Sequence, residues 1–264
     1  MKYDKNILPL AESPMKSYHQ FADLLSIILN HDSENFLINN FVQLYSFKIA
    51  KNLDYHSIGY YIPYNLFKQC PFLNYQKISH EFVVTITDDI VSFLIHCIDN
   101  RYYIWTDYDQ YYIPKTPAYH MRHYNHDIFI YGYDSNCNIF YCTEFLGLEG
   151  YSHIEVGFDD FKFSYYESSK SIDPNRVVNG IVLLKYGEKE HRINIEYIKQ
   201  TIDDYIYEKN SYKMVLPDDR WRFAQEEYIY GIAVYDNIKY YINETLKNDP
   251  DEVYLKLFFV LLEH

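Results

Sequence analysis

A short segment of the chain carries three histidines at intervals of three residues: His120, His123 and His126. On one helical face, three imidazoles at this spacing could bind a zinc ion. However, the segment follows Pro114 and Pro117 and leads directly into an apolar run, which argues against a shared helical face. Three interpretations therefore stay open: metal ligands, surface histidines, or a single catalytic histidine at the start of a strand.

His126 is the best placed of the three for catalysis, because it lies where the loop is expected to become a strand. The next expected strand presents Thr143 and Glu144 beside it across a hairpin. A histidine that acts as a general base needs an acceptor that fixes its tautomer and stabilises the imidazolium. Glu144 is the candidate acceptor, and the alternative is an ordinary carboxylate at a strand end.

The elements that must position these residues follow from the hydrophobic period. Steps of three and four predict an amphipathic helix from Tyr18 to about Asn30, with Ser17 as its N-cap. A short helix is predicted over residues 35–47 and a long one over residues 79–98. The period then changes to two, which predicts strands over residues 102–106, 128–133, 139–143 and 154–156. The turn Gly132-Tyr-Asp-Ser-Asn is predicted to join the two central strands.

Helices followed by an antiparallel meander indicate an α+β fold. Beyond Ser168 the pattern allows one further strand pair over residues 177–186, and helices over residues 193–207, 222–246 and 252–264. We therefore expect a core in residues 1–170 and a mainly helical C-terminal portion in residues 171–264. The last helical pattern stops in mid-period, so the natural chain is expected to extend beyond His264.

Composition excludes several classes of function. The 37 acidic and 24 basic residues give a formal net charge of −13, so a nucleic-acid partner is not expected. The longest strongly apolar run, Leu257 to Leu262, is far shorter than the roughly 20 residues that span a bilayer. The N-terminus has no signal-peptide pattern, so we expect a soluble, cytoplasmic protein without a membrane partner. No phosphate-binding glycine motif and no Cys-x-x-Cys pair occurs.

The order of these features resembles a papain-like family, that of the butirosin-biosynthesis acyltransferase N-terminal domain. The resemblance spans nearly the whole chain and is carried by Ile7-Leu-Pro-Leu10 before a helix, Trp105-Thr-Asp-Tyr-Asp109, Asn125-His-Asp-Ile-Phe-Ile-Tyr-Gly-Tyr-Asp134, Phe140-Tyr-Cys-Thr-Glu-Phe145, Tyr230-Gly-Ile-Ala-Val-Tyr235 and Leu261-Leu-Glu-His264.

The resemblance implies a papain-like, cysteine-peptidase-type core and amide-bond formation in nonribosomal or thiotemplated natural-product biosynthesis. In that family, a cysteine at the N-terminus of the first helix takes an acyl group from a carrier-protein thioester, and an amine then collects it. His126 maps onto the family histidine, and Glu144 maps onto the acidic position, where the family usually has Asp. The implied partners are an acyl or peptidyl carrier protein, whose phosphopantetheine arm carries the substrate, and a small amine or peptide. No resident cofactor or metal is expected.

This chain departs from the family at the nucleophile, because no cysteine stands near the start of the first helix. Ser17 is the preferred match, although a register slip would place His19 or Gln20 there. Cys70 and Cys97 fall in other segments and are poor substitutes. Three explanations compete: a serine nucleophile, an inactivated variant, and a natural pseudoenzyme that binds without reacting. Besides acyl transfer, the open functions are therefore a non-catalytic binding scaffold and a papain-like peptidase.

Overall fold

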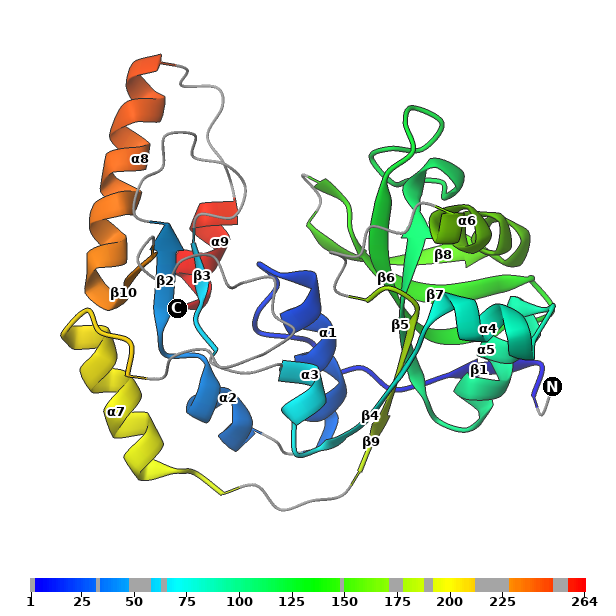
Figure 1. Cartoon of the computed structure of the whole chain (residues 1–264), viewed down its shortest axis with the longest axis horizontal. Helices are drawn as coiled ribbons and strands as arrows, with labels where there is room; N and C mark the ends of the chain where they lie inside the picture. The colour runs from blue at the N-terminus through cyan, green and yellow to red at the C-terminus, as the bar shows by residue number, and fades with distance from the viewer. Residues whose placement is uncertain are drawn as a thin grey trace. The chain divides into compact units, whose positions relative to one another are not determined.

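The chain, for which we analyse a computed structural model, divides into two units that are each made of two stretches of sequence (Figure 1). The first unit comprises Met1–His31 and Cys70–Lys189, and the second comprises Asp32–Gln69 and Glu190–His264. The structure describes residues 3–31, 34–47, 58–62, 66–147, 150–170, 178–187, 192–211, 228–248 and 256–264. The expected single division between residues 170 and 171 differs from this arrangement, because a strand beyond residue 171 is part of the first unit's sheet.

The first unit is built on an antiparallel sheet that has seven strands among the described residues. These strands are β1 (Lys5–Ile7), β4 (Leu73–Ile78), β5 (Tyr103–Asp109), β6 (Asn125–Asp134), β7 (Ile139–Phe145), β8 (Tyr151–Gly157) and β9 (Ile181–Tyr186). Their order is β4-β9-β5-β6-β7-β8, and β1 pairs with the far end of β6. Antiparallel pairing throughout, with helices on the sheet, confirms the α+β class.

The hairpin between β6 and β7 forms where the turn residues predicted it. The Asp134 carboxylate accepts hydrogen bonds from the backbone N–H groups of Asn136 and Cys137. Asn138 closes the turn with a positive φ of 54°, a conformation that asparagine tolerates better than most residues. The hairpin fixes the register of the two strands that carry His126 and Glu144.

Four helices in the described part of the first unit pack on this sheet: α1 (His19–Ile28), α4 (His80–Ile86), α5 (Ile90–Asp99) and α6 (Phe158–Lys170). The single long helix predicted over residues 79–98 is wrong, since the chain leaves the helix at Thr87 and starts a new one at Ile90. Asp89 caps the new helix by accepting the backbone N–H of Ser92. Helix α6 was not predicted.

The two faces of the sheet are covered by different helices (Figure 1). The strand register places Trp105, Phe129 and Thr143 on one face, and helix α1 reaches this face at Thr143. Helices α5 and α6 pack against the sheet at β5 from the other side. There the buried rings of Phe140 and Phe161 lie edge to face, 5.3 Å apart.

The second unit contains a small antiparallel sheet with the strand order β10-β2-β3. Its described elements are α2 (Glu34–Asn40), β2 (Leu44–Phe47), β3 (Ile58–Tyr60), α3 (Leu66–Gln69), α7 (Ile195–Ile206), β10 (Tyr228–Tyr230), α8 (Val234–Asn248) and α9 (Lys256–Glu263). The predicted helix over residues 35–47 is wrong in its second half, which forms β2.

The C-terminal portion is therefore not only helical, because β10 pairs with β2 across about 180 positions of sequence. The helices predicted over residues 193–207 and 252–264 are present as α7 and α9, although residues 252–255 lie outside the described part. The helix predicted over residues 222–246 starts only at Val234, and residues 222–227 also lie outside the described part. Among the described helices, none combines the length and the apolar character needed to cross a bilayer.

Candidate functional site

His126 and Glu144 lie on the neighbouring strands β6 and β7, and the structure brings their side chains together. The Nδ1 atom of His126 is 3.0 Å from Oε1 of Glu144. Glu144 is fully buried, and its other oxygen accepts a hydrogen bond of 2.7 Å from the hydroxyl of Tyr108 on β5. The backbone N–H of Phe145 donates to Oε1 at 2.9 Å. The carboxylate is thus fixed from two sides and presented to the imidazole.

The His126 ring lies at the border between the interior and the solvent, with 23% of its side chain exposed. Tyr108 packs edge-on against the ring, and Tyr124 stacks on it. Burial lowers the pKa of His126, but the carboxylates of Glu144 and Asp127 outweigh burial and raise the pKa to about 9. Since Nδ1 faces Glu144, Nε2 is the nitrogen that remains for a substrate.

Helix α1 begins at His19, and its N-cap is Tyr18, whose side chain makes no capping hydrogen bond. The expectation that Ser17 caps the helix is therefore wrong: Ser17 precedes the cap and is fully buried. The side chain that the helix start presents to His126 is that of His19, which was one of the register alternatives. The two imidazole rings are nearly parallel, at 9°, with centroids 6.4 Å apart.

His19 is held by an acid one helical turn later and by strand β7. Its Nε2 atom lies 3.1 Å from Oδ2 of Asp23 and 3.1 Å from the carbonyl oxygen of Thr143. The hydroxyls of Thr143 and Tyr151 donate to Oδ1 of Asp23 at 2.6 and 2.9 Å. Asp23 is fully buried, so these contacts replace its hydration.

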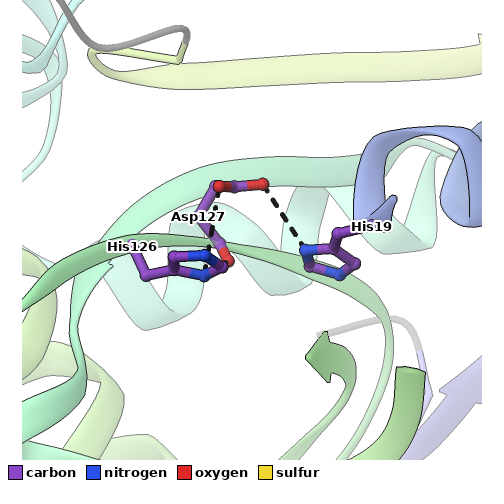
Figure 2. Close-up of side chains that lie close together, drawn as sticks. All are labelled: His19, His126 and Asp127. Atoms are coloured by element: carbon purple, nitrogen blue, oxygen red, sulfur yellow. Dashed lines mark hydrogen bonds and ion pairs between the residues drawn. The ribbon is translucent and has the colours of Figure 1, made fainter. Parts of the chain in front are cut away.

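The carboxylate of Asp127 joins the two histidines (Figure 2). Its Oδ2 atom lies 3.5 Å from Nδ1 of His19 and accepts the indole N–H of Trp105 at 2.7 Å. Its Oδ1 atom lies 4.0 Å from Nδ1 of His126. Asp127 thereby connects the start of helix α1 to the start of strand β6.

The electrostatics of this cluster follow from three carboxylates around two imidazoles. Burial lowers the pKa of His19, but Asp23, Asp127 and Glu144 raise it to about 10. Burial raises the pKa of Asp23 to about 7 against the opposite effect of His19 and two hydroxyls. Burial also acts to raise the pKa of Asp127, yet the two histidines and Trp105 hold it well below the usual range. The carboxylates therefore favour the cationic, ion-paired form of both rings.

The three histidines singled out by their spacing have different surroundings. The His123 side chain is 65% exposed, and its Nδ1 atom lies 2.7 Å from Oδ2 of Asp109. His120 is exposed and stacks on Tyr119. The donor group that the structure does bring together, within 4.8 Å, is His19, His126 and Asp127.

The three buried cysteines lack the environment of an activated thiol. Cys70, Cys97 and Cys142 are buried, and Cys137 is exposed after β6. Burial raises the pKa of the Cys70 and Cys97 thiols to about 12 and that of Cys142 well above its ordinary value. A thiol needs a lowered pKa to act as a nucleophile at neutral pH.

Several members of the cluster were missed from the sequence: Asp23, Asp127, Tyr108, Tyr151 and Trp105. One local signal was present, since His19 and Asp23 stand four residues apart at a helix start and so share a face. Neither a scan against protein-family models nor a search of the curated proteins found a match to this chain.

Proposed function

We propose that this protein transfers an acyl group from a carrier-protein thioester to an amine, on a papain-like core, with His126 moving the proton. The observation that supports this most directly is the 3.0 Å contact between Nδ1 of His126 and the buried carboxylate of Glu144. The resemblance implies this arrangement, with a histidine at a strand start and an acid on the next strand. Helix α1 against an antiparallel sheet agrees with the same core.

The proposed reaction uses no nucleophile from the protein. The helix start, where the resemblance implies a cysteine, carries His19, whose Nε2 atom is occupied by Asp23 and Thr143. An amine is itself a sufficient nucleophile for a thioester once a base takes its proton. Direct attack by the amine is therefore the pathway that fits this cluster.

In the proposed step, the amine nitrogen attacks the thioester carbonyl carbon and a C–N bond forms. The neutral form of His126, whose share grows as the pH rises towards the pKa of about 9, accepts the amine proton at Nε2, and Glu144 stabilises the resulting imidazolium. The C–S bond then breaks, and the proton passes from His126 to the departing thiolate of the phosphopantetheine arm. The products are an amide and a free thiol.

A second candidate function is binding of an acylated carrier or a peptide without turnover. It is favoured because His19 stands at the helix start, where the resemblance implies a cysteine. His19 has little exposed surface, at 8%, and both of its nitrogens face protein groups. A papain-like peptidase is a weaker candidate, because peptide bonds are less reactive than thioesters and the helix start supplies no thiol.

The test is an assay of thiol release and amide formation from short-chain acyl-pantetheine thioesters with a panel of primary amines. We expect His126→Ala to lower kcat by about 10²–10⁴-fold, as for loss of a general base. His123→Ala is the matched control, because His123 also pairs with an aspartate but lies outside the cluster; it should retain wild-type activity. Wild-type thiol release no faster than that of His126→Ala would overturn acyl transfer and leave binding as the function.

A further inference from the structure

We infer that His19, His126 and Asp127 form a binding site for a divalent transition metal ion of the Zn²⁺ class. The inference is independent of acyl transfer, since a metal ion would bind these side chains whether or not the protein turns over a thioester. Each residue offers one ligand atom, and the three atoms lie within 4.8 Å of one another. Figure 2 shows the Asp127 carboxylate beside both imidazole rings.

One pair of these atoms already has nearly the spacing of two ligands on one bound ion. Zinc–nitrogen and zinc–oxygen bonds are about 2.0–2.2 Å, so tetrahedral ligand atoms stand roughly 3.4 Å apart. The Nδ1 atom of His19 and Oδ2 of Asp127 are already 3.5 Å apart. The Nδ1 atom of His126 is 4.0 Å from Oδ1 of Asp127 and 3.0 Å from Glu144, so metal binding requires this partly exposed ring to move towards the ion.

The orientation of His19 also suits a metal ligand. Its Nδ1 atom is buried, and within the described residues its contact is the 3.5 Å ion pair with Asp127 rather than a well-formed hydrogen bond. Its Nε2 atom is held by Asp23 at 3.1 Å, which leaves Nδ1 aimed at Asp127. Metal-binding histidines usually have this arrangement, in which a carboxylate fixes the outer nitrogen and orients the inner one towards the metal.

The charge and the ligand atoms of the cluster favour a divalent transition metal ion. The cluster contains three carboxyl groups, those of Asp23, Asp127 and Glu144, and a divalent ion compensates part of their negative charge. Two imidazoles and one carboxylate suit zinc and its neighbours better than calcium or magnesium, which take oxygen ligands. Three protein ligands also leave a coordination position open.

Metal binding would occupy the histidine that acyl transfer uses. An ion bound to His126 prevents that ring from accepting a proton, so the two roles exclude each other at one moment. Acyl transfer should therefore fall as the ion is added, if the protein has that activity. The binding test below does not depend on this effect.

The test uses chelator-treated, untagged protein titrated with Co²⁺, which reports tetrahedral coordination through its visible d–d absorption. Wild type should bind one equivalent, and Zn²⁺ should abolish the absorption by displacement. His126→Gln and Asp127→Asn should lose the signal, whereas His123→Gln should keep it. Asp23→Asn removes the carboxylate that holds Nε2 of His19, not a proposed metal ligand, and should weaken binding by about 10–100-fold.

The outcomes separate the site from misfolding and from the proposed function. His126→Gln changes a partly exposed side chain, so its circular dichroism should match wild type while its Co²⁺ signal is absent. No Co²⁺ absorption in wild type, or equal loss in His123→Gln, would overturn the site. Because activity is not measured, failure of the thioester assay leaves this result unaffected, and failure of Co²⁺ binding leaves the thioester assay unaffected.

Discussion

The substitution Asp23→Asn should destabilise the first unit strongly, although it only replaces one carboxylate oxygen by an amide NH2 group. Asp23 is fully buried and accepts hydrogen bonds from Thr143 and Tyr151 while it pairs with His19. Loss of the charge weakens each hydroxyl bond by about 1 kcal/mol. Loss of the ion pair leaves His19 buried with one partner fewer, and breaking such pairs costs about 3–5 kcal/mol in total. Because Asp127 still faces His19, we expect the lower end of that range, about 3 kcal/mol, or roughly a 150-fold change in the unfolding constant.

The measurement is urea unfolding at neutral pH with EDTA present, followed by tryptophan fluorescence. A Trp221→Phe background leaves Trp105, which lies in the cluster, as the reporter of the first unit. Glu155→Gln, an exposed change on β8, is the control and should stay within about 0.5 kcal/mol of wild type. Combined with His19→Gln, Asp23→Asn should cost less than the sum of the two single changes, by about 1–3 kcal/mol. A cost below about 1 kcal/mol, or additivity in the double variant, would refute the buried pair.

Three further results are expected. Metal-free protein should lose stability as the pH rises, because the pKa values of His19 and His126 are about 10 and 9 in the folded state against 6.5 for a free histidine. The stability that the two raised pKa values contribute is complete below pH 6.5 and is lost as the pH rises through 9 and 10. His19→Gln should therefore flatten the alkaline part of a plot of melting temperature against pH, and an unchanged plot would contradict the shift. His19→Cys should form an acyl adduct with a pantetheine thioester, seen as a mass increase, whereas Ser17→Cys should not, because helix α1 presents residue 19 to His126; an adduct at position 17 alone would reverse this register. Asp89→Ala should cost about 1 kcal/mol by removing the cap of α5, with Asp88→Ala as the exposed control; equal costs would contradict the capping role.

Strands β5 to β9 followed from local pattern, whereas β1 and β4 were not predicted, and other errors arose where capping or long-range pairing decided the structure. Apolar residues at every second position, with a turn at residues 132–136 between them, were sufficient to predict β6 and β7. The break between α4 and α5 depends on Asp89 as a cap, which the continuous apolar period hid. Helix α6 follows β8 directly after Gly157, and two of its four buried residues are serines, so no apolar period marked it as a helix. The sheet of the second unit joins segments far apart in sequence, which periodicity cannot indicate.

At the site, the sequence predicted the proximity of His126 and Glu144 on one hairpin, but it did not predict the other residues of the cluster. His126 and Glu144 are close because adjacent strands bring them together, and a turn motif predicted those strands. The position of His19 depended on where α1 begins, and a difference of two residues from Ser17 changes which side chain faces the sheet. Asp127 was overlooked because neighbours on a strand normally point to opposite faces. Asp127 contacts His19 because helix α1 approaches the start of β6, which the sequence does not indicate.

Chemical rescue of His126→Ala by free imidazole tests most directly whether the His126–Glu144 pair moves the proton in acyl transfer. The partly exposed ring leaves a space at the border of the interior, and Glu144 remains there to orient an imidazole from solution. Amide formation by His126→Ala should be weak without imidazole and should rise with its concentration, while His123→Ala should show wild-type activity and no response. If His126→Ala forms amide as fast as wild type without imidazole, His126 does not transfer the proton and the proposed function is wrong.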